Sequence, residues 1–147
     1  MPKGELSGSQ TKIQGSQENK RSLQRENESA NTLVENGYNV EQNPSTQTTD
    51  NVREGAQPDY RINGEIFDNY APNYQAEVEQ IRNQISRKVK RKQTYKVVLN
   101  LDDSAVPISD IKTMFTIRKP VPNLQQLIII KKGQLIEMNL TNNAGDI

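Results

Sequence analysis

Apolar residues recur at helical spacing in three stretches of the chain. The first begins at Ser22 and stops at Gly37, the second spans Tyr74–Lys92 and the third spans Pro107–Ile117. Spacings of three and four residues place apolar side chains on one face of a helix, while Gly37 suits a left-handed stop and Pro107 a first turn. The apolar positions are Leu23, Ala30, Leu33 and Val34 in the first stretch, Val78, Ile81, Ile85 and Val89 in the second, and Ile108, Ile111, Met114 and Phe115 in the third.

Strand patterns alternate with these predicted helices. The loop Asn43–Gln57 is longer than compact domains usually keep unless it is functional or mobile. The order helix, strand, hairpin, helix, strand, helix, strand, strand predicts an α/β fold with a central mixed β-sheet flanked by helices. Alternating or continuously apolar runs predict the strands at 38–42, 59–62, 65–70, 95–101, 124–131 and 134–140.

The two runs around Asn63-Gly64 form the clearest local signal. Asn-Gly between alternating runs favours a type I′ hairpin turn, because both residues tolerate a positive φ. Asp59 stands four residues before Asn63 and Asp68 four residues after Gly64, so the turn makes them cross-strand partners on one face. Two carboxylates this close repel each other unless a cation or a shared proton lies between them. The pair is therefore a metal site or an acid–base dyad, unless both are ordinary strand carboxylates that face water.

Composition limits the chemistry that this chain can perform. Its 147 residues include neither Cys nor His, which excludes thiolate zinc sites and nucleophile systems that depend on histidine. Residues 1–21 are polar and predicted to be a flexible linker, leaving 22–147 as one domain. No apolar run is long enough to span a membrane, and no signal-peptide core follows Met1. The chain is thus expected to be cytosolic or a piece of a larger polypeptide.

Helical phase separates the acidic residues of the first predicted helix. At about 100° per residue, Glu26 falls on the flank of the apolar face, whereas Glu28 and Glu35 point away from it. A carboxylate directed toward a core needs a partner, while an outward one needs only water. Taken alone, a residue in the position of Glu26 is more often a solvated flank residue, and a functional acid directed toward the core side is the alternative.

The second predicted helix ends in a cationic stretch without an acid among its charges. Such a run is either a solvated face or a surface that follows phosphates. The cations are Arg82, Arg87, Lys88, Lys90, Arg91 and Lys92, with Lys96 shortly after.

Three of these features together resemble the PD-(D/E)XK, restriction-endonuclease-like nucleases. They are the acid on the first helix, Pro58-Asp59 opening a strand, and Asp68 on the next strand. The stretch from Arg25 to Val40 is also similar to the opening helix and strand of archaeal Holliday junction resolvases. There the catalytic acid stands eleven residues before the glycine, which favours Glu26 over Glu28.

The fuller resemblance is to the C-terminal tRNase toxin domains of contact-dependent growth inhibition (CdiA) proteins. It runs from about Leu23 to Met138 and rests on RENESA, GYNVEQNP, PDYRINGEIFDNYAP, Ile85-Ser86-Arg87-Lys88-Val89 and VVLNLDD. The superfamily's acid-x-Lys is here Asp68-Asn69-Tyr70, and the family places its lysine on the following helix. The resemblance thus assigns that role to Lys88, with Arg87 and Lys90 as further candidates.

This resemblance implies a metal-dependent tRNA endonuclease. Glu26, Asp59, Asp68 and Lys88 would be catalytic, with Glu28 as the second choice for the helix acid. Asp59 and Asp68, helped by Glu26, would hold a divalent ion, Mg²⁺, Mn²⁺ or Zn²⁺. The cationic stretch Arg82–Lys96 and the loop Asn43–Gln57 would bind the RNA backbone.

The resemblance also implies a cognate immunity protein as partner. It further implies delivery from a large secreted cell-surface protein into the cytoplasm of a neighbouring bacterium. Two other functions remain compatible with the residues: a DNA-directed nuclease with the same site chemistry, and a non-catalytic module whose cationic helix binds nucleic acid or an acidic partner.

Overall fold

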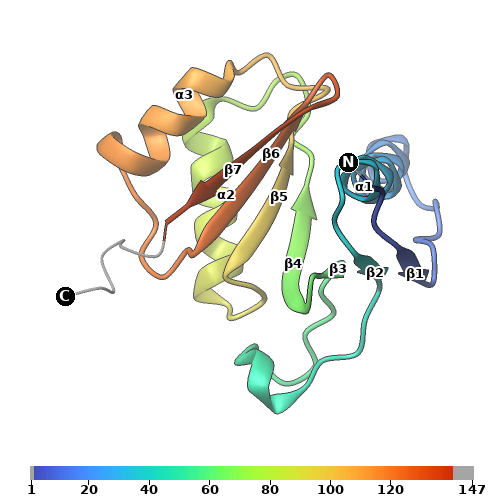
Figure 1. Cartoon of the computed structure of the whole chain (residues 1–147). Helices are drawn as coiled ribbons and strands as arrows, with labels where there is room; N and C mark the ends of the chain where they lie inside the picture. The colour runs from blue at the N-terminus through green and yellow to red at the C-terminus, as the bar shows by residue number, and fades with distance from the viewer. Residues whose placement is uncertain (1, 141–147) are drawn as a thin grey trace.

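A computed structural model of the chain describes residues 2–140 and contains one mixed sheet with helices on both faces (Figure 1). The predicted α/β class and the central mixed sheet are therefore confirmed. In chain order the elements are β1 (Leu6–Gly8), α1 (Gln17–Glu35), β2 (Val40–Gln42), the 3₁₀ helix η1 (Thr48–Asp50), β3 (Tyr60–Ile62), β4 (Glu65–Tyr70), α2 (Val78–Lys90), β5 (Lys96–Asn100), α3 (Ile108–Thr113), the π-helix η2 (Met114–Arg118), β6 (Gln126–Lys131) and β7 (Gln134–Asn139).

The seven strands lie in the sheet in the same order as in the sequence. Strands β1 and β2 are parallel, as are β4, β5 and β6, while the pairs β2–β3, β3–β4 and β6–β7 are antiparallel. The parallel strands β4, β5 and β6 are joined through α2 and α3, because parallel neighbours need a crossover. Consequently both helices pack on the same face of the sheet.

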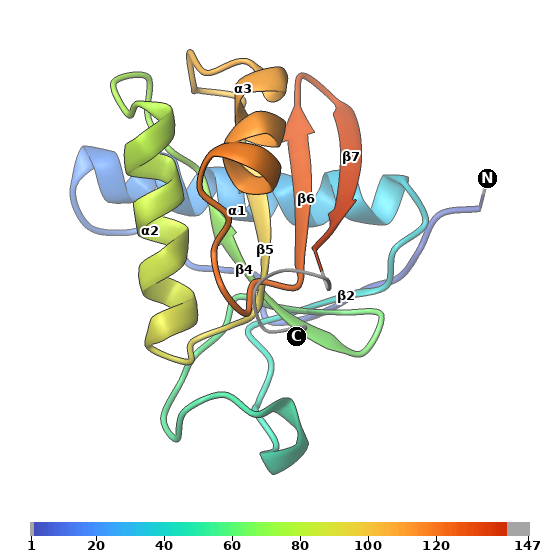
Figure 2. The ribbon, with the colours of Figure 1, turned by 90° about the vertical axis from the view of Figure 1, so that its left-hand side faces the viewer.

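Helix α1 covers the opposite face. Figure 2 shows α1 passing behind the strands while α2 and α3 lie in front of them. Successive residues of β5 point to opposite faces, and so Val97 packs with Ile81 and Ile85 of α2, while Val98 packs with Ala30 and Leu33 of α1. Two apolar cores thus form, one on each side of the central strands. Within residues 2–140, no helix is long and apolar enough to cross a membrane.

The Asn-Gly turn has the predicted conformation. Asn63 has φ 46° and Gly64 has φ 90°, so both turn residues are left-handed, as a type I′ turn requires. The strands pair with Ile62 opposite Glu65 and Tyr60 opposite Phe67. This register fixes the positions of the residues that follow it on both strands.

The first 21 residues contain secondary structure that the apolar pattern did not indicate. Leu6–Gly8 forms β1, which pairs with β2, and α1 begins at Gln17 rather than Ser22. Ser16 caps the helix by accepting a hydrogen bond from the backbone N–H of Asn19 at 3.1 Å. Backbone pairing and capping order this segment, whereas the prediction of a linker considered only apolar burial. A domain boundary at residue 21 stays a prediction, and the end of the predicted domain, 141–147, lies outside the described residues.

The other helices differ from their predicted bounds at the ends. Helix α2 begins at Val78 instead of Tyr74, and the long polar loop contains η1. The third predicted helix, Pro107–Ile117, is α-helical only to Thr113 and continues as the π-helix η2. The apolar residues predicted to face the core still do so across this change, since Ile111, Met114 and Phe115 are all buried.

Candidate active site

The hairpin brings Asp59 and Asp68 together. Tyr60 pairs with Phe67, so the next residues out along the two strands are these two aspartates. The backbone N–H of Asp59 donates to Oδ1 of Asp68 at 3.1 Å, and the backbone N–H of Asn69 donates to Oδ2 of Asp59 at 2.8 Å. The predicted closeness of the two carboxyl groups is therefore present in the structure.

Helix α1 supplies Glu26 to this pair. Glu26 is buried, with 7% of its surface exposed, and its carboxylate accepts a hydrogen bond from the hydroxyl of Thr11. Its backbone carbonyl accepts a second one from the hydroxyl of Tyr60, which fixes the helix over β3. Glu28 instead points outward and forms an ion pair with Arg25 at 2.5 Å. The predicted helical phase is thus correct for both acids.

Burial and mutual repulsion raise the pKa of Asp59 and of Glu26. Burial, followed by the negative charges of Asp68 and Glu26, raises the pKa of Asp59 well above its ordinary value. Burial also raises the pKa of Glu26, although hydrogen bonds from Thr11 and with Asp59 oppose the rise. A carboxyl cluster of this kind needs a proton or a cation to be stable. Raised carboxyl pKa values are also typical of groups that transfer protons near neutral pH.

Lys88 brings a positive charge to the pair from helix α2. Its ammonium group donates to Oδ2 of Asp68 at 3.1 Å, with 23% of the lysine side chain and 4% of the aspartate side chain exposed. The two further candidates for this role lie elsewhere. Arg87 donates to the side chain of Gln84 at 2.8 Å, and Lys90 is exposed on the flank of the helix.

Two residues of the site were missed by the sequence analysis. Gln93 donates from its amide to Oδ1 of Asp68 at 3.4 Å and accepts from the guanidinium of Arg53 at 3.2 Å. The second residue is Thr11, whose hydroxyl donates to the carboxylate of Glu26. The side chain of Asn27 positions Thr11, because it accepts from the backbone N–H of Thr11 at 3.1 Å and donates to its backbone carbonyl at 2.9 Å. No periodicity marks either residue, since Gln93 follows the end of α2 and Thr11 lies in an irregular polar segment. Only the position of Gln93 beside the cationic stretch could have drawn attention to it.

The acids of the site provide a small set of oxygen ligands. Across residues 2–140, no group of three or more His, Cys, Asp or Glu side chains is arranged to hold one metal ion. Glu26 therefore lies beside Asp59 and Asp68 without completing a three-residue ligand set. Asp59 and Asp68 fit a hard divalent cation that keeps several waters, as Mg²⁺ commonly does. The raised pKa of Asp59 fits a position where a cation would replace a proton.

The cationic stretch divides into exposed and structural residues. Arg82 is 8% exposed, and its guanidinium donates to the backbone carbonyls of Lys119 and Pro120, both at 3.0 Å. It anchors the segment after η2, so its prediction as an RNA contact is withdrawn. Lys96 pairs with Glu65 at 3.4 Å. The exposed cations of the stretch are Arg87, Lys90, Arg91 and Lys92.

Comparison with known proteins identifies the relatives of this chain. The family model described as the contact-dependent growth inhibition CdiA C-terminal domain matches residues 56–136, a range that includes the hairpin and α2. The tRNA nuclease CdiA-2 of Burkholderia pseudomallei (strain 1026b) is 41% identical over 131 residues, 88% of this chain. This chain spans only 4% of the length of that relative.

A solved structure extends the similarity to the fold. The CdiA-CT/CdiI toxin and immunity complex from Burkholderia pseudomallei contains a chain that matches with a TM-score of 0.82 and 38% identity. The match covers 93% of this chain and 100% of the solved one. The similarity of fold therefore extends over most of the chain.

Proposed function

The chain belongs to the family of contact-dependent growth inhibition CdiA C-terminal domains, and from this membership we propose that it is a toxin that cleaves tRNA by metal-dependent hydrolysis. The observation that carries the proposal is the pair of carboxyl groups at the end of the hairpin, with Lys88 3.1 Å from Asp68. The similar protein from Burkholderia pseudomallei is named a tRNA nuclease, which supports tRNA as the substrate.

In the proposed reaction a water oxygen bonds to the scissile phosphorus and the bond to the leaving oxygen breaks. A divalent ion held by Asp59 and Asp68 would lower the pKa of bound water and offset negative charge on the phosphate. Glu26 can take up the proton that the water loses, because burial raises its pKa and so favours binding of the proton. The leaving oxygen takes a proton from solvent, so that one water is divided between the two products and atoms and charges balance.

Lys88 has a separate role in this proposal. A phosphoryl group gains charge on its equatorial oxygens during transfer, and a fixed ammonium beside them stabilises that charge. Lys88 is held in position by Asp68, so its ammonium is oriented before the substrate arrives. Gln93 bonds to the same carboxylate and is proposed to fix its orientation.

We also propose that the core is of the PD-(D/E)XK type. Support comes from the arrangement of Glu26 on α1, Asp59 and Asp68 on a hairpin, and a lysine on the next helix. The lysine stands on α2 instead of on β4, which is the departure that the resemblance to the CdiA toxins implies.

A cognate immunity protein is the proposed partner. The similar solved chain is part of a toxin and immunity complex. The tRNA nuclease CdiA-2 is many times longer than this chain, which spans 4% of its length. We therefore propose that this domain is the C-terminal part of a large cell-surface protein, enters a neighbouring bacterium and acts in its cytoplasm.

Substrate choice tests the proposal. Purified protein is incubated with total bacterial tRNA, ribosomal RNA or supercoiled plasmid DNA in the presence of Mg²⁺, Mn²⁺ or Zn²⁺, beside the Asp68→Ala variant. Discrete tRNA fragments that the variant does not produce are expected on a denaturing gel.

The other outcomes favour the two alternatives. Plasmid cleavage with intact tRNA would identify a DNA-directed nuclease. Intact nucleic acids in every lane, together with a shift of tRNA in a native gel for both proteins, would identify a binding module.

A further inference from the structure

We propose that a polar groove at the C-terminal end of α2 is a subsite for one unpaired nucleotide of the RNA. The inference rests on the proposed function, because it names the part of the substrate that the protein holds beside the cleavage site. It extends that function by assigning residues outside the acidic cluster to recognition.

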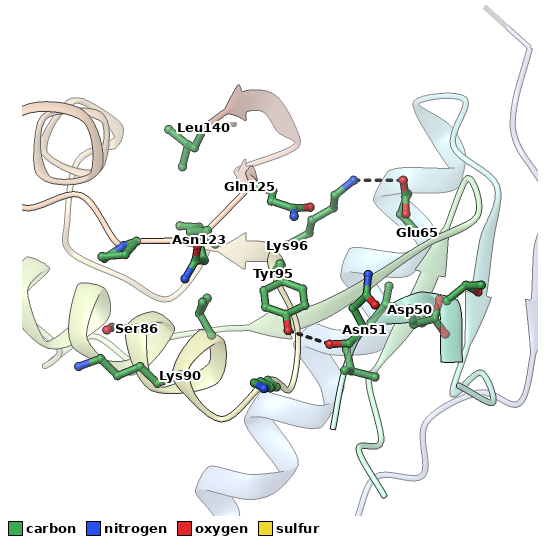
Figure 3. Close-up of a pocket in the computed structure, with 17 residues that line it drawn as sticks. Asp50, Asn51, Glu65, Ser86, Lys90, Tyr95, Lys96, Asn123, Gln125 and Leu140 are labelled. Carbon is green, nitrogen blue, oxygen red and sulfur yellow. Dashed lines mark hydrogen bonds and ion pairs between the residues drawn. The ribbon is translucent and has the colours of Figure 1, made fainter. Parts of the chain in front are cut away.

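The groove is large enough for a nucleotide. It has a volume of about 830 Å³, within the range of small-molecule sites, about 300–1,000 Å³. Four segments far apart in the sequence, together with Leu140 after β7, form its walls (Figure 3). They are the end of the long polar loop, the start of β4, the last turns of α2 with the residues after it, and the segment before β6, contributing residues 49–52, 65–66, 86–96 in part, and 122–125.

Two lysines give the groove an uncompensated positive charge. Lys90 and Lys92 are exposed on its wall, and neither forms an ion pair with any residue that the structure describes. The two acids of the wall are already neutralised, since Asp50 pairs with Arg61 at 2.9 Å and Glu65 with Lys96 at 3.4 Å. Two free ammonium groups on one wall favour a phosphate.

The remaining wall offers groups suited to an unstacked base. The side-chain amides of Asn51, Asn123 and Gln125 line the groove and form no hydrogen bond with residues 2–140. The hydroxyl of Tyr95 donates to the backbone carbonyl of Asn51 at 2.7 Å, which holds the aromatic ring in the wall (Figure 3). Amides that bond base edges and rings that stack on them are the means by which proteins bind single-stranded RNA.

An unpartnered hydroxyl in the wall points to a missing ligand. Ser86 is 4% exposed, lines the groove, and its Oγ has no hydrogen-bond partner in the protein. Buried polar groups are nearly always paired, because leaving one unpaired is unfavourable. The Oγ of Ser86 lies just beneath the surface of the wall, so a ligand in the groove would supply the partner that Ser86 lacks after a small shift of the wall.

The groove adjoins the acidic cluster. Ile66 lines it, and Asp68 lies two residues further along β4, about 7 Å away at the rise of a strand. Gln93, which bonds Asp68, follows directly after Lys92. The proposed subsite and the cleavage site are thus connected through β4, while the residues of the acidic cluster themselves lie outside the lining of the groove.

Binding measurements on a protein that does not cleave test the inference. In an Asp68→Asn background, anisotropy of a labelled single-stranded RNA and of tRNA is measured between about 50 and 200 mM salt. Lys90→Gln with Lys92→Gln should weaken binding at least tenfold and reduce the slope of log K against log salt for the single strand by about 0.7, since the two lysines are proposed to bind one phosphate and each single-strand phosphate contributes about 0.7. Lys112→Gln with Lys132→Gln removes the same charge from exposed residues outside the groove and should change affinity less than twofold.

Uncharged variants test the base contacts. Asn123→Ala with Gln125→Ala should weaken binding of single-stranded RNA about fivefold and leave binding of a blunt RNA duplex unchanged. Ser86→Ala should weaken the single-stranded complex without lowering the melting temperature, because its hydroxyl bonds nothing in the protein. Equal effects of the groove lysines and the control lysines, or equal losses on single and double strands, would overturn the inference.

The inference and the proposed function fail in different experiments. Titration of the full chain with a 5′-mononucleotide, followed by NMR of the side-chain amides of Asn123 and Gln125, detects binding without cleavage. Shifts at these amides together with no cleavage of any tRNA by the wild type would retain the subsite and reject the nuclease. Cleavage of tRNA by the wild type, with no shift of these amides and with unchanged RNA affinity of the groove variants, would retain the nuclease and reject the subsite.

Discussion

At the scale of single residues, the site concentrates like charges where water is scarce. Asp59 has two acidic neighbours and lies at the end of a strand whose register leaves no freedom to separate it from Asp68. Such an arrangement lowers the stability of the folded protein whenever all the acids are ionised. It persists because the turn and the flanking apolar pairs hold the strands together, which is usual where function requires an unfavourable contact.

The pH dependence of stability should reveal this cost. The folded protein binds the Asp59 proton more tightly than the unfolded chain does, because the folded pKa is raised. In metal-free buffer the free energy of unfolding should therefore fall as the pH rises from about 4 through the folded pKa. Asp59→Asn should flatten this fall and unfold at an equal or higher temperature at about pH 7. Asp110→Asn, at an exposed position of α3, should leave the pH profile as in the wild type.

The helix acid can be assigned by a matched pair of variants. Glu26→Gln should lower tRNA cleavage by about 100-fold or more, a size typical of lost proton transfer, because Glu26 lies against Asp59. Glu28→Gln should remain within about twofold of the wild type, since Glu28 only pairs with Arg25 on the surface. Single-turnover cleavage rates measure both, and a larger loss in Glu28→Gln would contradict the helical phase seen in the structure.

At the scale of secondary-structure elements, the hairpin and β1 illustrate opposite cases. The hairpin has a turn sequence, alternating strands and apolar partners, and all of these were visible in the sequence. Strand β1 has three exposed residues, and backbone bonds hold it, including the N–H of Val40 to the carbonyl of Glu5 at 2.8 Å. Backbone pairing leaves no apolar pattern, so local sequence could not predict it.

Two glycines test whether β1 is packed as the structure has it. Gly8 and Gly55 both have a left-handed backbone, with φ 77° and 84°, so alanine at either position should cost about 1–2 kcal/mol. A Cβ on Gly8 would also lie 2.1 Å from the carbonyl oxygen of Gln42, while one on Gly55 meets nothing within 4 Å. Gly8→Ala should therefore destabilise more than Gly55→Ala in urea unfolding. Equal losses would mean that β1 does not pair with β2.

The cationic side chains on α2 differ in role according to the residues that they contact, although they belong to one charged run in the sequence. Arg82 and Lys88 belong to the same charged run, yet one anchors backbone carbonyls and the other meets a catalytic candidate. The helical period predicts which face a residue occupies, and it does not predict what another element places opposite that face. The sequence therefore indicated Glu26, Asp59, Asp68 and Lys88 through local patterns and family resemblance, but it could not predict the long-range contacts of Gln93 and Thr11.

At the scale of the whole molecule, α1 is the only helix on its face of the sheet within the described residues, and it must be held in place to position Glu26. Asp103, in the loop after β5, accepts hydrogen bonds from Arg21 at 2.7 Å and from Arg25 at 3.0 and 2.9 Å. These hydrogen bonds lower the pKa of Asp103. One carboxylate thus ties the first helix to the second half of the chain.

Loss of this contact should affect stability and activity together. Asp103→Asn should lower the free energy of unfolding by about 1–2 kcal/mol, a range for charge-assisted bonds reduced for partial exposure, and should slow cleavage through a displaced Glu26. Because the folded pKa of Asp103 is depressed, its contribution should be lost as the pH falls through that pKa. Glu35→Gln breaks an exposed pair with Lys3 and serves as the control, with a change below about 0.5 kcal/mol. An equal effect of the two variants in chemical unfolding would show that α1 is held by packing alone.

The most direct measurement concerns the joint action of the ion and the acidic pair. Metal-stripped wild-type protein is incubated with tRNA in EDTA, and Mg²⁺, Mn²⁺ or Zn²⁺ is then added in excess, with Asp59→Asn and Asp68→Ala beside the Glu28→Gln control. Discrete fragments should form only after an ion is added, and only with the wild type and Glu28→Gln. Equal cleavage in EDTA, or by the two aspartate variants, would contradict an active site built on this carboxyl pair.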